Sequence, residues 1–161
     1  MNESARPARA IGLLSVDQLR DLDGLELFRG IIAGRFPAPP ITETMGFWLK
    51  EAEQGRVVFA AQPERRHYNP IGSVHGGFAA TLLDSAMSCA VHTHLKKGNG
   101  YTTVEFKVNF VRPIMDTTGA VYCEGKSINV GGRIGTAEGR ITDSAGKLYA
   151  HGTTTCLRFS L

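Results

Sequence analysis

The chain has 161 residues, of which 42% are hydrophobic and 20% charged, and this composition predicts a single globular domain with its own core. It contains no apolar run of the roughly 18 residues that a membrane span needs, no signal-peptide pattern at its start, and no basic cluster typical of nucleic-acid binding. We therefore expect a cytoplasmic protein without a membrane or nucleic-acid partner, whose net charge of +3 suits an anionic small molecule.

The first predicted element is a helix over residues 15–32. Ser15 followed by Gln18 forms a capping-box pattern, and apolar residues then recur along one side. Gly24 weakens this helix, because glycine loses more backbone freedom on folding than other residues. We therefore expect a short helix near the N-terminus.

The segment FPAPP, residues 36–40, cannot continue a helix and indicates a linker. It divides the chain into an N-terminal extension with a short helix and a Pro-rich linker, residues 1–42, and a main domain, residues 43–161. The main domain begins with two predicted strands, residues 45–52 and 56–62, joined as a hairpin.

The longest apolar pattern is a helix that starts at Gly76 and continues to about Leu95, with apolar residues on more than one face. A narrow strip of small or polar residues runs along one side of it. The strip consists of Gly77, Thr81, Asp84 and Ser88. Asp84 is the one charged residue in this helix. A carboxylate in apolar surroundings indicates a functional site, or else an acid that is solvated or bonded to neighbouring hydroxyls.

The start of this helix has a second unusual feature. Gly76 and Gly77 leave backbone N–H groups uncovered by side chains at the positive end of the helix dipole, which is the outline of a receptor for a carbonyl or an oxyanion. Asn69 and His75, in and after the preceding loop, are candidates to bond a ligand there. They are equally typical of residues that cap a helix.

Four further strands are predicted after the helix. The first, residues 101–113, follows a break at residues 98–100 and alternates most clearly, so we expect a buried face and an exposed face. The expected buried face holds Thr102, Val104, Phe106, Val108 and Phe110, against Thr103, Glu105, Lys107 and Asn109 on the other face. The remaining strands are expected at residues 119–129, 133–142 and 147–159, with short turns that favour antiparallel pairing.

Two strands, a long helix and four strands predict an α+β fold in which a curved antiparallel sheet wraps around one helix. Such a sheet has two open edges and a face that one helix cannot cover completely. We therefore expect at least a dimer.

The chain carries the pattern HxNxxGxxHGGxxxTLxD, and with this arrangement it resembles the hotdog-fold acyl-CoA thioesterases of the phenylacetate-degradation (PaaI-like) branch. The pattern is formed by His67, Asn69, Gly72, His75, Gly76, Gly77, Thr81, Leu82 and Asp84. The resemblance covers roughly residues 43–159. It implies a hotdog fold, a homodimer with one continuous sheet or a dimer of such dimers, and sites at the dimer interface that draw on both chains.

The resemblance also implies roles for individual residues. Asp84 falls on the helix acid that acts as general base or nucleophile, and Gly76 falls where a backbone N–H polarises the thioester carbonyl. Asn69 matches the loop asparagine that helps hold the reacting group or the water, and His75 matches a supporting histidine. Thr103 falls where a relative has an assisting hydroxyl, although strand alternation puts it on the polar face.

Binding of coenzyme A, as part of the substrate, needs basic groups for its phosphates, and Arg112 and Arg133 at strand ends are candidates, as is the Gly77 backbone. No separate cofactor and no metal are expected, because His92 and His94 point in different directions on a helix. The acyl group is open between aryl and medium-chain groups. Four residues could shape its pocket or belong to the core: Phe47, Trp48, Phe59 and Met87.

The leading hypothesis is therefore an acyl-CoA thioesterase that releases a free acid and CoA. One alternative is a hotdog acyl-thioester dehydratase or hydratase, in which a histidine such as His75 would act as the base. Another is a non-catalytic acyl-CoA-binding protein.

Overall fold

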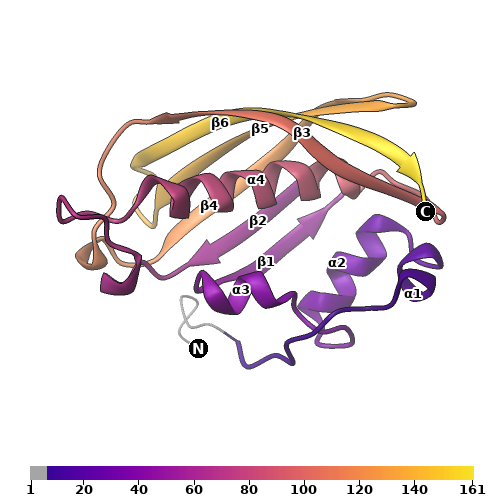
Figure 1. Cartoon of the computed structure of the whole chain (residues 1–161), viewed down its shortest axis with the longest axis horizontal. Coiled ribbons are helices and arrows are strands. Elements are labelled where there is room, and N and C mark those ends of the chain that lie inside the picture. The colour runs from indigo at the N-terminus through magenta and orange to yellow at the C-terminus, as the bar shows by residue number, and fades with distance from the viewer. Residues whose placement is uncertain (1–6) are drawn as a thin grey trace.

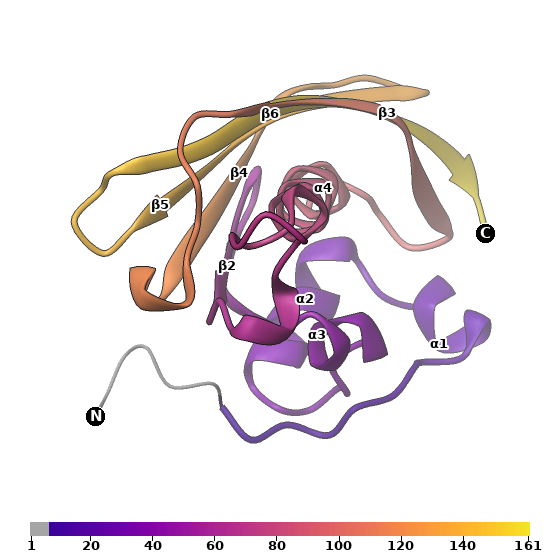
Figure 2. The ribbon, with the colours of Figure 1, turned by 60° about the vertical axis from the view of Figure 1, so that its left-hand side comes forward.

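The computed structural model describes residues 7–161 and shows one six-stranded antiparallel sheet curved around a long helix (Figures 1 and 2). The sheet order is β1-β2-β4-β5-β6-β3, so β1 and β3 form its edges. The strands are β1 Phe47–Glu53, β2 Arg56–Ala61, β3 Asn99–Phe110, β4 Val121–Val130, β5 Ile134–Asp143 and β6 Leu148–Ser160. The helices are α1 Val16–Arg20, α2 Gly24–Ile32, α3 Pro40–Thr44 and α4 Gly76–His92, with short 3₁₀ turns at Arg65–His67 and Asp116–Thr118. The predicted α+β class and hotdog arrangement are confirmed.

The core lies between α4 and the concave face of the sheet. Leu82, Leu83 and Met87 of α4 are almost completely buried, and they pack with Phe47 of β1 and Ile141 of β5. Phe47 and the other three aromatic or methionine candidates for a substrate pocket are thus core residues. Burial on several faces is what the continuous apolar pattern of this helix predicts.

A row of three glycines lies on the sheet beneath α4, and two of them, Gly125 and Gly139, allow the helix to approach closely. Gly125, Gly139 and Gly152 lie directly opposite one another on β4, β5 and β6. A Cβ atom at Gly125 would collide with the backbone of Ala86, and one at Gly139 would lie 2.7 Å from the side chain of Met87. Helix and sheet therefore meet backbone to backbone at Gly125, and the Met87 side chain fills the space that a Cβ would need at Gly139.

The N-terminal segment differs in part from its prediction. The capping box of Ser15 and Gln18 is confirmed, but the single helix expected over residues 15–32 is two helices, α1 and α2. The break occurs because the carboxylate of Asp23 turns away to the end of α4, where it accepts a hydrogen bond from the Lys97 backbone N–H (3.0 Å). The division at residue 42 stays a prediction, and residues 1–6 lie outside the described part.

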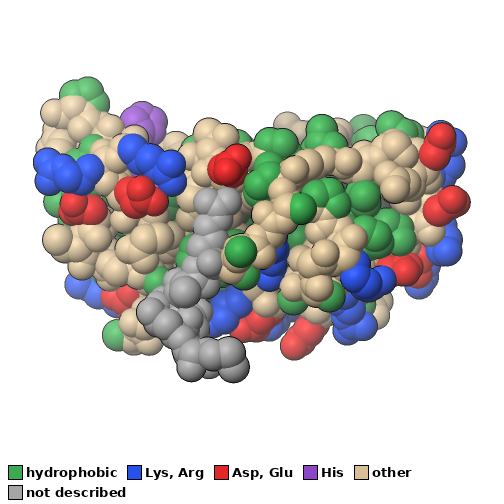
Figure 3. All heavy atoms as spheres, turned by 90° about the horizontal axis from the view of Figure 1, so that it is seen from below, with side chains coloured by type: hydrophobic (Ala, Val, Ile, Leu, Met, Phe, Trp, Pro, Cys, Tyr) green, Lys and Arg blue, Asp and Glu red, His purple; other side chains and the backbone are tan. Residues whose placement is uncertain are grey.

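The N-terminal helices pack beside α4 and cover β1 (Figure 2). The guanidinium of Arg9 donates hydrogen bonds to the carbonyls of Leu49 and Ile32, which fastens the first described residues to β1 and α2. Figure 3 shows the molecule from below the view of Figure 1, and hydrophobic side chains gather there over the end that carries α1 and α2.

Candidate functional site

Asp84 projects from α4 toward β3. The hydroxyl of Thr103 donates a hydrogen bond to Asp84 Oδ1 over 2.8 Å, and both side chains are half-buried. A hydrogen bond from a hydroxyl stabilises a carboxylate and fixes its direction. The acid is thus oriented at the edge of the sheet, neither enclosed in the core nor free in solvent.

A β-bulge explains why Thr103 reaches Asp84. The pairing of β3 with β6 shifts register between Thr103 and Glu105, so that Val104 is an extra residue. Thr103 lies opposite the buried Cys156, and directly opposed residues share a face of the sheet. The prediction that strict alternation puts Thr103 on the polar face with Glu105 was wrong, because the bulge reverses the alternation.

The same bulge explains why the predicted buried face of β3 was wrong for Thr102 and Val104. Thr102 and Val104 lie on the outer side, and Val104 is 53% exposed. Beyond the bulge, Phe106 and Phe110 share the face that looks toward α4, yet they remain 40% and 59% exposed because β3 is an edge strand. The apolar face of this strand is therefore largely uncovered.

The N-terminus of α4 presents a backbone donor. His75 is the N-cap, and its Nδ1 accepts a hydrogen bond from the Gly77 N–H (2.8 Å). The Gly76 N–H has no acceptor among residues 7–161. A Cβ at Gly76 would lie only 3.1 Å from the ring of Phe110. Gly76 therefore offers a free N–H beside an aromatic ring, whereas that of Gly77 is already engaged.

Asn69 organises the loop that precedes α4. Its Oδ1 accepts hydrogen bonds from the backbone N–H groups of Ile71 (3.1 Å) and Ser73 (3.2 Å), and its Nδ2 donates to the Ser73 hydroxyl (3.1 Å). These bonds form an Asx turn. The second proton of Nδ2 is available to another acceptor, since an amide NH₂ has two.

A cavity of about 350 Å³ adjoins this helix end. Its wall includes Asn69, His75, Gly76 and Arg112, with apolar surface from Phe110 and other residues. The guanidinium of Arg112 donates to the Leu148 carbonyl (2.6 Å), which holds it at the rim. Polar groups that the sequence analysis singled out in the loop, at the start of α4 and after β3 therefore line the same cavity.

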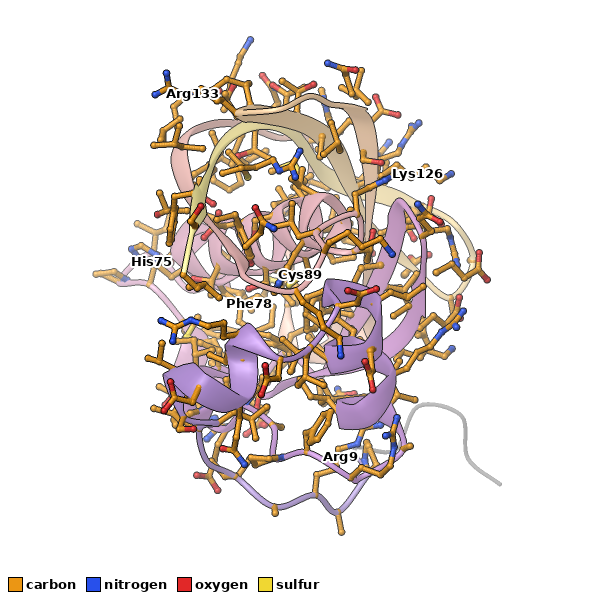
Figure 4. All side chains as sticks on the ribbon, turned by 90° about the vertical axis from the view of Figure 1, so that its right-hand side faces the viewer. Arg9, His75, Phe78, Cys89, Lys126 and Arg133 are labelled. Atoms are coloured by element: carbon orange, nitrogen blue, oxygen red, sulfur yellow. The ribbon has the colours of Figure 1, made fainter. Side chains whose placement is uncertain are left out.

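Arg133 does not belong to this cavity. It lies in the turn between β4 and β5, and Figure 4 shows it projecting outward from the sheet, away from His75. Arg133 precedes Ile134, which pairs with Leu157 near the end of β6. Arg112 lies two residues after Phe110, which pairs with Ala150 near the start of β6. The two arginines proposed for coenzyme A therefore lie at opposite ends of the sheet within one chain.

Gly76 and Asp84 are also separated. They lie eight residues apart on one helix, which corresponds to about 12 Å at 1.5 Å per residue. A donor and a base that act on the same carbonyl must both lie about 3 Å from it. One chain therefore holds two half-sites, the acid with Thr103 and the helix end with its cavity.

Two half-buried groups near Asp84 were not predicted as part of the site. The hydroxyl of Tyr101 lies 3.4 Å from the Ser88 hydroxyl and 3.9 Å from the Cys89 sulfur, and burial raises the pKa of Tyr101 well above its usual value. Burial also raises the pKa of Cys89 to about 12, so this interior residue (Figure 4) is a thiol and not a nucleophilic thiolate. Tyr101 lies two residues before Thr103 and therefore shares its face of β3, and the missing signal was again the bulge, which lets this face and the face of Phe106 both look toward α4.

Residues 7–161 contain no group of three or more His, Cys, Asp or Glu side chains arranged to hold a metal ion. Cys89, Cys123 and Cys156 are free thiols, and the last two are buried. No helix in the described part of the chain is long and apolar enough to cross a membrane.

Residues 71–150 match the family model of the thioesterase superfamily. A Halobacterium salinarum protein named as an esterase is 36% identical over 69 residues, which are 42% of this chain and 44% of that protein. The match thus spans less than half of that relative's length. Human acyl-coenzyme A thioesterase 13 is 28% identical over 112 residues, which are 66% of this chain and 76% of that protein.

The fold has solved counterparts as well. A variant of the phenylacetic acid degradation protein PaaI from Thermus thermophilus superposes with a TM-score of 0.67 and is 26% identical, covering 74% of this chain and 99% of that chain. Sequence and structure comparisons therefore agree on the same superfamily.

Proposed function

Because the chain belongs to the thioesterase superfamily, we propose that it is an acyl-CoA thioesterase that hydrolyses an aryl- or medium-chain acyl-CoA to the free acid and CoA. The observation that carries this proposal is the half-buried Asp84, held by Thr103 at an open sheet edge. A carboxylate oriented in this way can activate water or attack a carbonyl itself.

The reaction needs the two half-sites together. Water adds to the thioester carbon as the Asp84 carboxylate takes its proton, and the Gly76 N–H stabilises the negative charge that develops on the carbonyl oxygen. The C–S bond then breaks, and the thiolate of CoA takes the proton from Asp84. Direct attack by Asp84 would instead form an anhydride that water opens. A single turnover in H₂¹⁸O separates the two routes, since only the anhydride route can place ¹⁸O in Asp84.

The separation of about 12 Å along α4 favours a dimer in which Asp84 of one subunit works with the helix start of the other. The N-terminal segment covers the β1 edge, where the Arg9 guanidinium donates a hydrogen bond to the Leu49 carbonyl. The β3 edge instead presents Val104, Phe106 and Phe110, all at least 40% exposed. Pairing of two β3 edges would bury this apolar surface and extend the sheet.

The cavity beside Gly76 suits the substrate carbonyl and the start of the CoA arm. Arg112 at its rim provides a positive charge for a phosphate, and Asn69 provides a spare amide proton. Arg133 would reach CoA only from the other subunit, so we propose Arg112 as the main phosphate contact.

The dehydratase or hydratase alternative is less well supported. Nδ1 of His75 accepts the Gly77 N–H, so in the neutral ring the proton is on Nε2 and no free lone pair is left to act as a base. A non-catalytic acyl-CoA-binding protein is distinguished by experiment, because it would bind acyl-CoA without releasing thiol.

The test is thiol release from acyl-CoA esters by the wild-type protein and by Asp84→Asn. We expect Asp84→Asn to lower kcat by about 10²–10⁴-fold, the usual contribution of a general base, with the fold and oligomeric state intact. Asp17→Asn, which changes an exposed acid on α1, is the matched control and should retain full activity. Unchanged turnover in Asp84→Asn would remove this residue from the mechanism.

A further inference from the structure

A second, more apolar pocket lies at the other end of α4. This distal pocket has a volume of about 200 Å³. Its main wall residues are Leu19, Leu22, Leu27, His92, Tyr101 and Phe159. Three of these six are leucines from the N-terminal segment, and the others come from α4, β3 and β6.

The distal pocket lies along the line that leads away from Asp84. Asp84, Ser88 and His92 are spaced by four and therefore lie on one side of α4, with His92 about 12 Å beyond Asp84. On β3, Tyr101 precedes Thr103 by two residues, about 7 Å along the strand. The hydroxyl of Tyr101 points to Ser88, while its ring forms part of the pocket wall. A thioester carbonyl at Asp84 is thus within an acyl chain's length of the pocket.

The wall is uncharged at neutral pH. The ring of His92 packs edge-on against Phe28 (5.2 Å between centroids) and at a tilt of 50° against Tyr101 (4.8 Å), and burial lowers the pKa of His92 to about 4. A neutral histidine between two aromatic rings behaves as part of an apolar surface. The pocket therefore suits an apolar group and disfavours a charged one.

The volume limits the size of that group. An apolar cavity of about 150 Å³ is large enough to bind benzene. A pocket of about 200 Å³ therefore holds one aryl ring with its linking carbon, or the end of a medium-length alkyl chain, but not a long-chain fatty tail.

The N-terminal helices are fixed in position against this pocket. The Gly24 N–H donates to the Leu95 carbonyl (3.0 Å), and Asp23 accepts from the Lys96 ammonium (2.9 Å) and the Lys97 N–H (3.0 Å). All three leucines of the wall precede residue 71, where the superfamily match begins. This wall is thus an addition to the matched region.

We propose that the distal pocket binds the far end of the acyl group, and that α1 and α2 set the largest acyl group that the enzyme accepts. This inference rests on the proposed thioesterase function, since it concerns the acyl group of the same substrate. It gives the N-terminal segment a role in substrate selection.

The test compares two tryptophan substitutions in the same helix, α1. Leu19→Trp places a large ring in the distal pocket, whereas Val16→Trp changes a residue that is 59% exposed and outside it. The measured quantity is the ratio of kcat/KM for phenylacetyl-CoA or octanoyl-CoA to kcat/KM for acetyl-CoA. We expect this ratio to fall at least about tenfold in Leu19→Trp and to stay constant in Val16→Trp, since a single methylene in such pockets is worth about 10-fold or more.

Leu19→Ala provides the opposite change. It enlarges the pocket and should raise kcat/KM for dodecanoyl-CoA relative to octanoyl-CoA, severalfold, which loss of folding cannot imitate. If wild-type protein hydrolyses these esters but the ratios do not change in either Leu19 variant, the role of the distal pocket is overturned and the thioesterase function stands. If the wild-type protein hydrolyses none of them, both proposals fall.

Discussion

The N-terminal and C-terminal ends of α4 are completed by different kinds of contact. At the N-terminal end, the cap is the exposed His75, and the Gly76 N–H has no acceptor in the described part of the chain. At the C-terminal end, the Gly24 N–H bonds to Leu95 just beyond the helix, and the N-terminal helices cover the last turn. One end is open and polar, and the other is closed and apolar.

This difference fits what each end would contact under the proposed function. A thioester carbonyl and the phosphates of CoA would need donors and access from solvent, and the open end beside Gly76 has both. An acyl group would need shelter from water, as at the closed end. Asp84 lies between the two ends, so a single helix would hold the acid between the reacting group and the acyl group.

The largest expected effect concerns the open end of α4 and tests whether it works with Asp84 of another subunit. The experiment combines two subunits that carry different substitutions. A heterodimer of Asp84→Asn and Gly76→Val subunits, isolated with two affinity tags, carries one site with both lesions and one intact site. We expect it to regain about half of wild-type turnover, because a two-fold interface forms two equivalent composite sites. Each homodimer should remain at least about 10²-fold below wild type, because Asp84→Asn removes the base and the side chain added by Gly76→Val crowds Phe110 and covers the backbone N–H.

The control heterodimer pairs Asp84→Asn with a subunit that carries both substitutions. No intact site can form in it, so it should stay inactive. Full recovery in the control, or no recovery in the test pair, would contradict a site shared between the open end of one α4 and the acid of another.

The free energy of unfolding should be sensitive to a larger side chain at Gly24, at the closed end of α4. A Cβ at Gly24 would collide with the His92 carbonyl, so Gly24→Ala must push α2 away from α4. We expect a loss of about 3 kcal/mol in the free energy of unfolding, measured by urea denaturation. Gly12→Ala, whose Cβ meets only Pro37 at 3.5 Å, is the matched control and should change stability by less than about 0.5 kcal/mol. Equal effects of the two substitutions would show that this contact is not tight.

The closed end should also weaken in acid. Burial lowers the pKa of His92 from 6.5 to about 4, so below pH 6.5 the unfolded chain binds a proton that the folded chain refuses. Folding stability from this group is therefore complete above pH 6.5 and decreases as the pH falls toward 4, by about 2 kcal/mol between pH 7 and pH 5.

Comparison with His92→Phe isolates this effect, because all other titrating groups are common to both proteins. Denaturation at pH 7 and pH 5 should show the smaller loss in His92→Phe. An identical pH dependence in the two proteins would mean that His92 is protonated in the folded state.

The smallest expected effect concerns the hydrogen bond that orients the acid. Thr103→Val removes the hydroxyl that donates to Asp84 but keeps the shape of the side chain, and we expect kcat to fall about tenfold, or about 1.4 kcal/mol. The neighbouring Thr102→Val, on the exposed side of β3, should retain wild-type kcat. A similar loss in both variants would point to disturbance of the strand instead.

Much of this architecture could be predicted from the sequence, because it depends on short-range patterns. The apolar periodicity of α4 and the glycines after His75 indicate a buried helix with an uncovered start. The dimer expected from the two open sheet edges and from the family resemblance stays a prediction.

The features that could not be predicted depend on contacts between distant segments. The bulge at Val104 is a shift in the register between β3 and β6, and nothing in the local alternation marks the extra residue. The break between α1 and α2 likewise arises because Asp23 bonds to Lys96 and Lys97, more than 70 residues away. The distal pocket needs both of these long-range events, and therefore had no sequence signal.

Gly125 and Gly139 have a consequence for the chemistry. Because these two positions carry no side chains, α4 rests on the sheet at Ala86 and Met87, within one turn of Asp84. The height of the acid above β3 is thus set by atoms that are missing from two other strands. A methyl group added at either glycine would push α4 away from the sheet and misalign the carboxylate, although it would touch neither substrate nor water.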